Sequence, residues 1–395
     1  MRVALLPLAL ASGKSPATRQ QATRPPQIQV MIFDAFSLSG LELKSRYAMA
    51  PMTRAFAPDG IPTEANAAYY RRRAAGGAGL IITEGVYVDH PTAGAQRDVP
   101  VLHGDAALAG WRLVTDAVHA ENSRIFAQLW HVGLARSRKD IERTGLLSSS
   151  PSGCVEDGVT LSEPMTQRDI KEVVAAFVRS AANARKAGFD GIELHAAHGY
   201  LIDTFLWERT NQRTDAYGGD IQRRTRLACD IIAEIKRSVG PGFLVDVRLS
   251  QWKQQDYRAV LAHTPAEWEA YLTPMVEAGA DIFHISTRRF WEPAFEGNPS
   301  TLAALTKQIT GKPVIAVGSA GLTQAKEPGW ERGDDWSIAP VKSIEYIEEA
   351  MARGDFDLIA MGRILLANPD WGHLVRAGRF DELRPYTRAS RDILY

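Results

Sequence analysis

From Met31 onward the chain repeats one pattern of hydrophobic and polar positions. A run of four to seven apolar, often β-branched residues is followed by a loop and then by a longer segment of helical period. The runs predict strands at residues 46–51, 79–84, 124–130, 189–195, 243–249, 281–287, 312–318 and 356–362. The periodic segments predict helices that include residues 105–122, 167–187, 221–239, 265–278 and 341–353.

This alternation predicts the fold class. Nearly continuous apolar strands that alternate with helices are typical of a parallel sheet covered by those helices. Eight such units favour a closed (β/α)₈ barrel, a TIM barrel with one domain. The alternative is an open doubly wound sheet, but the nearest approach to its G-x-G-x-x-G fingerprint, "AVGSAGL", lacks the required spacing.

Two segments fall outside the repeat. The stretch "FDAFSLSGLELKS" alternates and turns at Ser39-Gly40, so it predicts a hairpin that closes the bottom of the barrel. Residues 134–165, after the third strand, are rich in Ser, Gly and Pro and contain no clear element. Loops of that length are uncommon unless they are functional, which makes this segment a candidate lid.

The first thirty residues differ in composition from the rest. No acidic residue precedes Asp34, and Gln, Arg, Pro and Ser dominate residues 13–28. We expect residues 1–30 to be a disordered or mis-started extension and residues 31–395 to form the barrel domain of a cytoplasmic protein. A cleaved export signal is the alternative, because "MRVALLPLALASG" has a positive start and a short apolar run.

Composition narrows the classes of partner. The 46 Lys and Arg residues balance 46 Asp and Glu residues, so no overall field attracts nucleic acid or an anionic membrane. The densest basic run, "YRRR" at residues 70–73, has a helical pattern and predicts a solvated face. Two cysteines, Cys154 and Cys229, are too few for a disulfide framework or a cysteine-ligated cluster. No segment reaches the ~18 apolar residues that a membrane span requires.

Polar residues gather at the predicted strand ends, where a barrel of this kind builds its active site. The seventh strand ends at Gly318-Ser319 and the eighth at Gly362-Arg363. Backbone N–H groups beside one arginine are typical of the phosphate pocket of this fold. After the fourth strand come His195, His198 and Tyr200. The two histidines could also be metal ligands, although the Glu of H-E-x-x-H is absent, so we predict no metal.

Five motifs at these strand ends resemble the Old Yellow Enzyme family of flavin-dependent ene-reductases. They are "MAPMTR", "GLIITEG", "AQLWHVG", "HAAHGYLIDTFL" followed by "NQRTDAYGG", and "LIAMGRILLANPD". The resemblance extends from Met31 to about Arg376, and it fits the branch that carries threonine at position 53. Because the five motifs occur in the family's order, chance does not explain them.

The resemblance implies a flavin mononucleotide (FMN) at the mouth of the barrel. Thr53 would form a hydrogen bond with the flavin carbonyl next to N5, and Gln128 would form one with the pyrimidine edge. Arg248 would lie near N1, where its positive charge would stabilise the negative charge of reduced flavin. The implied cofactor-binding residues are Pro51, Met52, Thr53, Gly85, Gln128, Arg248, Gly318, Ser319, Gly362 and Arg363.

The resemblance also assigns the substrate side. His195 and His198 would donate hydrogen bonds to the carbonyl or nitro oxygen of an activated alkene, Tyr200 would give a proton to its α-carbon, and Trp130 would limit substrate size. NADPH or NADH would serve as reductant, and the protein would be a monomer or a homodimer that needs no nucleic acid or membrane partner.

Some positions depart from the family pattern. The loop "VYVDHPTAGAQRD" has no clear counterpart of a substrate-facing tyrosine, and "SQWKQQDY" replaces the usual proline after Arg248. The C-terminal stretch "RFDELRPYTRASRDILY" also differs, so substrate range stays open. Two other functions remain as alternatives: a different flavin barrel, such as a dehydroorotate or tRNA-uridine enzyme, and a barrel that has lost its cofactor and only binds a ligand.

Overall fold

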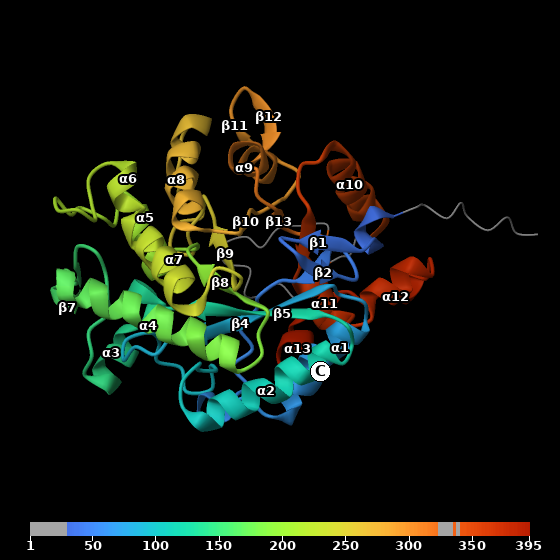
Figure 1. The fold of residues 1–395 in the computed structure, drawn as a ribbon, viewed down its shortest axis with the longest axis horizontal. Helices are drawn as coiled ribbons and strands as arrows, with labels where there is room; N and C mark the ends of the chain where they lie inside the picture. The colour runs from blue at the N-terminus through green and yellow to red at the C-terminus, as the bar shows by residue number, and fades with distance from the viewer. Residues whose placement is uncertain (1–29, 323–334, 337–339) are drawn as a thin grey trace, which may run out of the picture. The chain divides into compact units, whose positions relative to one another are not determined.

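The computed structural model describes residues 30–322, 335–336 and 340–395. Eight parallel strands close into a barrel in the order β10-β13-β15-β3-β4-β5-β8-β9, with helices around it (Figure 1). The strands are β3 (Tyr47–Met49), β4 (Leu80–Tyr87), β5 (Arg124–Trp130), β8 (Gly191–His195), β9 (Leu244–Leu249), β10 (Ile282–Ser286), β13 (Val314–Val317) and β15 (Leu358–Met361). The predicted (β/α)₈ barrel and all eight of its predicted strands are confirmed.

The outer helices follow the predicted segments closely. They are α1 (Glu64–Ala75), α2 (Asp105–His119), α4 (Gln167–Lys186), α7 (Arg226–Val239), α8 (Pro265–Ala278), α9 (Leu302–Thr310) and α10 (Pro340–Arg353). Local signals set their ends: α8 begins after the Thr264 cap with Pro265 at its first position, and it ends at Gly279 in the left-handed conformation. The segment predicted as one helix at residues 221–239 is two, α6 (Ile221–Arg224) and α7, which meet at Thr225.

The N-terminal hairpin is where the sequence predicts it. Strands β1 (Phe36–Leu38) and β2 (Leu41–Leu43) pair antiparallel, and Ser39 and Gly40 between them both have positive φ. Leu38 and Leu43 are fully or almost fully buried, and they belong to the same hydrophobic cluster as barrel residues such as Leu80 and Phe126. The hairpin therefore closes the N-terminal end of the barrel and leaves the opposite end for a site.

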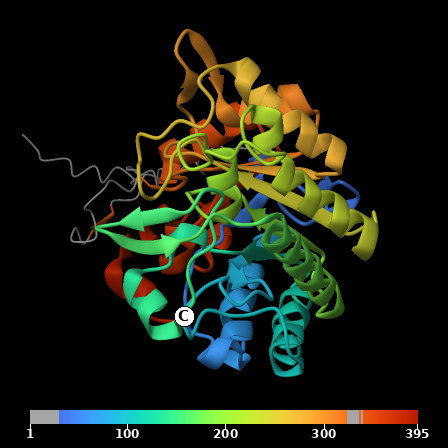
Figure 2. The same cartoon turned by 90° about the vertical axis from the view of Figure 1, so that its left-hand side faces the viewer.

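The prediction that residues 134–165 lack regular structure is wrong. They contain α3 (Arg138–Thr144) and a hairpin of β6 (Cys154–Glu156) and β7 (Val159–Ser162), which Figure 2 shows as a pair of green arrows. Asp157 and Gly158 form the turn, both with positive φ. An Asp-Gly pair is the turn that such short hairpins favour, so the signal was present in the sequence.

The prediction of a solvated basic face on α1 is wrong for half of the run. Arg71 is exposed and pairs with Glu121, but Tyr70 and Arg73 are buried. The Arg73 Nε donates to the carbonyl of Leu365, 3.1 Å away. This arginine therefore ties α1 to α11 (Arg363–Ala367), because helical spacing turns residues 70 and 73 to the same inward face.

The remaining short elements complete the described chain. They are α5 (Leu201–Leu206), α12 (Trp371–Arg376), α13 (Arg388–Arg391), β11 (Pro293–Phe295), β12 (Asn298–Thr301), β14 (Asp335–Trp336), β16 (Tyr386–Thr387) and the 3₁₀ turns Met31–Phe33, Pro58–Gly60, Gly133–Ala135 and Phe380–Glu382.

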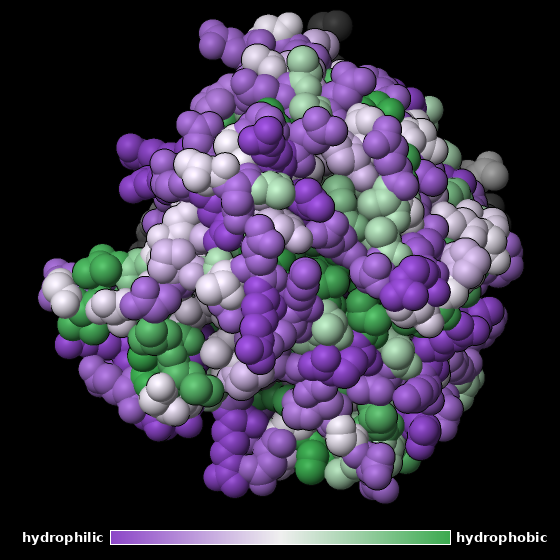
Figure 3. All heavy atoms as spheres, turned by 60° about the vertical axis from the view of Figure 1, so that its left-hand side comes forward, coloured by the Kyte–Doolittle hydropathy of each residue, from purple (hydrophilic) through white to green (hydrophobic). Residues whose placement is uncertain are grey.

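The face in Figure 3 is mostly hydrophilic, with hydrophobic residues in separate small groups. Among the described helices, none combines the length and the apolar character needed to cross a bilayer. The predicted extension or signal at the N-terminus lies outside the described residues, apart from Val30.

Candidate active site

Four aromatic side chains meet at the C-terminal ends of β5 and β8. Trp130 is the last residue of β5 and His195 the last of β8, while His198 and Tyr200 follow in the next turn. The ring centre of His195 lies 4.7 Å from that of Tyr200 and 5.0 Å from that of His198. Tyr200 also meets Trp130 edge to face at 5.1 Å. The structure therefore brings together the four residues that the sequence predicts on the substrate side.

Burial fixes the protonation states of this cluster. Burial, reinforced by the nearby charge of Arg248, lowers the pKa of both His195 and His198 well below the usual range. Burial also raises the pKa of Tyr200 to about 12. At neutral pH each imidazole is therefore neutral with one N–H group, and the phenol keeps its proton. The cluster offers donors without carrying charge.

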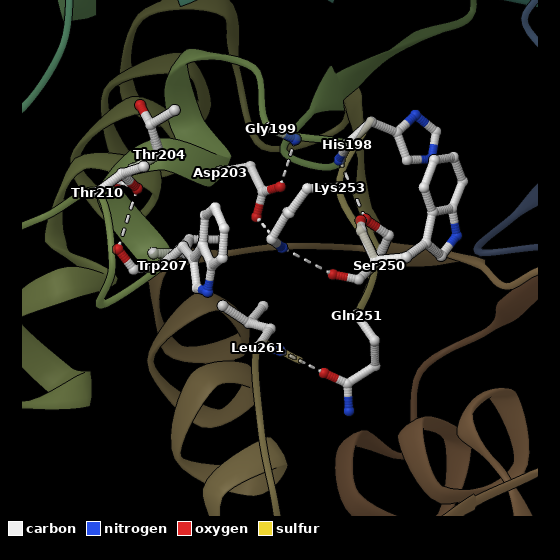
Figure 4. Close-up of polar contacts among 12 residues, drawn as sticks. His198, Gly199, Asp203, Thr204, Trp207, Thr210, Ser250, Gln251, Lys253 and Leu261 are labelled. Atoms are coloured by element: carbon white, nitrogen blue, oxygen red, sulfur yellow. Dashed lines mark hydrogen bonds and ion pairs between the residues drawn. The ribbon is translucent and has the colours of Figure 1, made fainter. Parts of the chain in front are cut away.

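The turn after β8 is strained and is held by side chains from elsewhere. His198 has a φ of 65°, a conformation that side-chain-bearing residues rarely adopt and that often marks a functional site. Its backbone N–H donates to Ser250 Oγ at 3.0 Å, and the N–H of Gly199 donates to Asp203 Oδ2 at 2.6 Å. Figure 4 shows both bonds beside the buried pair of Lys253 and Asp203, whose charged atoms are 2.7 Å apart. The surroundings therefore impose the conformation of this turn.

His198 and His195 differ in their hydrogen bonding. A ring nitrogen of His198, Nε2, lies 2.8 Å from Ser286 Oγ, and its ring stacks on Trp252 at 4.2 Å. The Nδ1 of His195 is buried without a hydrogen-bond partner among the described residues. To bind one oxygen together, His198 would have to offer its second nitrogen or leave Ser286.

A cavity lies beside this cluster at the ends of β3, β9, β10, β13 and β15. Its enclosed volume is about 200 Å³, and it opens to solvent on one side. Seven of the ten predicted cofactor residues line it: Pro51, Met52, Arg248, Gly318, Ser319, Gly362 and Arg363. Trp252 lines it too and stacks on His198, so the cavity and the aromatic cluster are continuous.

The other three predicted cofactor residues do not line this cavity. Thr53 is exposed, two residues after Pro51. Gly85 lies opposite Gln128 in the register of β4 and β5, and a Cβ at this position would collide with the indole of Trp130. Gln128 is buried, and its Nε2 donates to Glu193 Oε1 at 2.6 Å. Its amide nitrogen is therefore already engaged by the protein.

The residues present fit an anionic, partly apolar cofactor such as FMN. Arg248 is buried at the edge of the cavity, and its Nε has no hydrogen-bond partner within the described part of the chain. A buried donor of this kind needs an acceptor, because leaving it without a hydrogen bond costs about 1–3 kcal/mol. Gly318 and Gly362 leave room at the ends of β13 and β15, where a Cβ at Gly318 would lie 2.7 Å from the carbonyl of Thr287. An arginine, glycine turns and an apolar wall suit a phosphate joined to a ring system.

Three buried residues that the sequence analysis missed lie beneath Arg248. Glu193, Asp246 and His284 occupy the middle of β8, β9 and β10. His284 Nδ1 is 2.5 Å from Glu193 Oε2, and Arg248 Nη1 is 4.0 Å from Glu193 Oε1. A charged or titratable residue in the interior of each of "GIELH", "LVDVRL" and "IFHIS" was the available signal, because apolar barrel strands rarely bury charge without a partner.

The two carboxyl groups of this cluster take different charge states. Although burial alone would raise the pKa of Glu193, His284 and Arg248 hold it below its usual value. Burial and the negative charge of Glu193 raise the pKa of Asp246 well above its usual range. Glu193, Asp246 and His284 each offer one ligand atom, and these three atoms lie within 4.8 Å of one another, a spacing that could also hold a metal ion.

Another buried carboxylate holds the loop that carries Thr53. Glu84 Oε2 accepts hydrogen bonds from the backbone N–H groups of Arg54 and Ala55 at 2.8 and 2.9 Å. Burial raises the pKa of Glu84 to about 7. The sequence indicates Glu84 as the end of the second strand, but β4 continues to Tyr87, so Glu84 lies inside the strand and contacts the backbone of the neighbouring loop.

Comparison with known proteins agrees with this geometry. The model of the NADH:flavin oxidoreductase / NADH oxidase family matches residues 31–335. The chain belongs to this family. An NADH oxidase of Thermoanaerobacter brockii is 34% identical over 362 residues, which cover 89% of this chain and 52% of that protein. A putative 12-oxophytodienoate reductase of Oryza sativa subsp. japonica is 31% identical over 380 residues, covering 94% and 92% of the two chains.

A solved structure gives the same family. Old Yellow Enzyme from Pichia sp. AKU4542 superposes with a TM-score of 0.76 at 27% identity, over 93% of this chain and 91% of that one. The predicted membership of the Old Yellow Enzyme family is therefore confirmed. It implies FMN as cofactor and a nicotinamide dinucleotide as reductant. The chain spans only about half the length of the Thermoanaerobacter relative.

Proposed function

We propose that this chain is an FMN-dependent ene-reductase. It would use NADPH or NADH to reduce the C=C bond of α,β-unsaturated carbonyl or nitro compounds. The observation that carries this proposal is the cluster of His195, His198 and Tyr200 beside a cavity edged by Arg248. Two neutral imidazoles and one protonated phenol in contact are the donors that such a reduction requires.

The cofactor would occupy the cavity and the strand ends around it. Gly318, Ser319, Gly362 and Arg363 would hold its phosphate, and Pro51 and Met52 would line the cavity beside the ring system. Thr53, Gly85 and Gln128 would meet the ring system at the ends of β3, β4 and β5. Bound FMN supplies the hydride that the β-carbon of the alkene accepts.

The chain's own residues would act on the alkene oxygen and the α-carbon. As the β-carbon gains its C–H bond, negative charge moves to the carbonyl or nitro oxygen, and N–H groups of His195 and His198 stabilise it there. Tyr200 then passes its proton from Oη to the α-carbon, and solvent restores the phenol. Hydride and proton together saturate the double bond. Trp130, packed against Tyr200, limits the size of the substrate.

The reductant and the alkene would use the same space in turn. This arrangement requires an open cavity, and the one beside Arg248 opens to solvent. The segment of α3 and the β6–β7 hairpin stays a candidate lid over that space. The choice between NADPH and NADH, a monomeric or homodimeric state and a cytoplasmic location remain predictions.

An anaerobic absorption spectrum of the purified protein tests the proposal. We expect flavin bands that disappear when NADPH is added and return when cyclohexenone follows. In Tyr200→Phe we expect the first change at its normal rate and the second about 10²- to 10⁴-fold slower, the range for loss of a general acid. Flavin bands that never appear, even after FMN is supplied, would contradict the cofactor, and equal losses in both steps would contradict the role of Tyr200.

A further inference from the structure

The loop that follows β9, residues 250–257, contributes Trp252 and Tyr257 to the lining of the active-site cavity. This β9 loop is the segment in which the sequence departs from the family pattern, with "SQWKQQDY" after Arg248. Trp252 stacks on His198 and on Tyr257, with ring centres 4.2 and 5.4 Å apart. The β9 loop therefore touches the residues that the proposed function assigns to the substrate.

Within the β9 loop, one side chain reaches the proton donor itself. The Nε2 of Gln254 donates a hydrogen bond to Tyr200 Oη at 2.8 Å. We propose that Gln254 is a positioning residue for Tyr200, which sets the direction of the phenolic proton and stabilises the phenolate left after proton transfer. This proposal rests on the proposed function, because it concerns the step in which Tyr200 protonates the α-carbon.

The physical reason lies in the two roles of a hydroxyl group. A phenol can donate one hydrogen bond and accept others. When Gln254 occupies an acceptor site on Oη, the proton of Tyr200 must point elsewhere, and the neighbouring His195 ring marks the substrate side. An amide donor also favours the ionised phenol. Burial raises the pKa of Tyr200, and the bond from Gln254 works against that rise.

The backbone around Gln254 is fixed well enough for this task. Its N–H donates to the carbonyl of His198 at 3.2 Å, while the N–H of His198 donates to Ser250 Oγ. The adjacent Lys253 is fully buried against Asp203, in the helix that follows Tyr200 directly (Figure 4). Three bonds thus join the β9 loop to the turn that carries Tyr200. These bonds hold the backbone of Gln254 in place although the residue is exposed.

The test separates a donor from an acceptor at this position. Gln254→Met removes the hydrogen bond, and Gln254→Glu replaces the donor with a carboxylate that accepts the phenolic proton. Rapid anaerobic mixing follows flavin reduction by NADPH and reoxidation by cyclohexenone between pH 5 and 8. We expect reoxidation to slow about tenfold in Gln254→Met, the kinetic equivalent of one hydrogen bond, and more in Gln254→Glu. Flavin reduction should be unchanged in both variants.

The pH profile gives a signature that a merely structural role would not produce. Carboxyl groups titrate near pH ~4.3, so the introduced carboxylate regains a proton, and with it a donor, as the pH falls. Reoxidation by Gln254→Glu should therefore recover toward the acid end, while Gln254→Met should not. Gln255→Glu is the matched charge control, because its amide makes only a 3.5 Å contact with the carbonyl of Gly199. It should behave like the unsubstituted protein.

A spectroscopic measurement completes the test without turnover. With tyrosine labelled by ¹³C at Cζ, the signal of Tyr200 is the one that disappears in Tyr200→Phe. We expect Gln254→Glu to shift this signal at pH 7, because the phenol then donates a hydrogen bond to a carboxylate instead of accepting one from an amide, and Gln255→Glu to leave it in place. Normal reoxidation in both Gln254 variants beside a slow Tyr200→Phe would overturn the role of Gln254 and leave the proposed function intact. Normal reoxidation in Tyr200→Phe would instead overturn the role of Tyr200.

Discussion

Two buried sets of charged side chains support the site, and the fold positions them in different ways. The strand cluster, Glu193, Asp246, Arg248 and His284, lies on three adjacent strands. The loop pair, Asp203 and Lys253, joins α5 to the β9 loop. Barrel register places the strand cluster, since Glu193 is directly opposite Asp246 and His284 is opposite Arg248. The loop pair depends on side-chain bonds across segments that have no register.

Because of this difference, the cofactor side and the substrate side of the site depend on separate sets of contacts. Arg248 edges the cavity proposed for FMN, and the strands beneath it leave it little freedom. The turn with His198 and Tyr200 is set by Ser250, Asp203 and Lys253 instead. A change of loop sequence can therefore reshape the substrate side without disturbing the cofactor side, which is how one barrel fold supports many chemistries.

The largest expected effect comes from removing both carboxyl groups of the strand cluster. Glu193→Leu combined with Asp246→Asn leaves Arg248 buried with no anion, and a guanidinium cannot lose its charge. An uncompensated buried charge costs about 3–5 kcal/mol, so the free energy of unfolding should fall by that amount. Urea unfolding measures it, and fluorescence titration with FMN should show weaker binding as Arg248 loses its orientation.

The single substitutions serve as controls for this prediction. Asp246→Asn should be nearly neutral, because burial and Glu193 keep Asp246 protonated and an amide has the same shape. Glu193→Leu alone should cost less than the double change, since Asp246 can then ionise and replace the lost charge. Stability of the double variant within about 1 kcal/mol of the unsubstituted protein, the worth of an ordinary hydrogen bond, would show that the cluster does not hold Arg248.

Sequence alone predicts the strand side of the site far better than the loop side. Apolar runs end where polar residues begin, so β5 begins and ends at the predicted residues and His195 closes β8 as expected. Glu193 and His284 were missed because a single polar residue inside an apolar run does not reveal which partner it meets. The partner is set by strand register, which a list of strands does not contain.

The loop side could not be predicted for a different reason. Asp203 and Lys253 are 50 positions apart in the chain, and neither lies in a periodic segment that would place it. The contact of Gln254 with Tyr200 joins the same two segments, at a similar separation in the chain. The β6–β7 hairpin is the exception, because Asp157-Gly158 is a local turn signal that needs no knowledge of the rest of the fold.

Breaking the loop pair should lower the free energy of unfolding less than removing both carboxyl groups of the strand cluster. Lys253→Met leaves Asp203 buried, but burial already raises the pKa of Asp203, so the carboxyl can take up a proton and become neutral. An unsatisfied neutral group costs about 1–3 kcal/mol, and we expect a loss of that size in urea unfolding. Alkene reduction should slow in the same variant, because the β9 loop is no longer tied to the turn that carries Tyr200.

A double substitution distinguishes the charge from the packing. Lys253→Met with Asp203→Leu should recover part of the stability lost by Lys253→Met alone, because two apolar side chains can replace a buried pair. Alkene reduction should stay slow, since Asp203 no longer accepts the N–H of Gly199. If stability and rate recovered together, the loop pair would be a packing feature with no part in placing Tyr200.

A pH-dependent effect concerns Glu84, a strand carboxylate that holds a loop and so combines the two modes of construction. Burial raises its pKa from about 4.5 to about 7, so between these values the folded protein binds a proton that the unfolded chain has released. The contribution of Glu84 to stability is therefore complete below pH ~4.5 and is lost as the pH rises toward 7, by at most about 1.4 kcal/mol per pH unit. In Glu84→Gln this slope should be absent from urea unfolding measured between pH 5 and 7.

The exposed Glu269→Gln is the matched control and should keep the slope. An unchanged slope in Glu84→Gln would mean that the folded protein ionises Glu84 as easily as the unfolded chain does, and that its two backbone hydrogen bonds, rather than burial, dominate its environment.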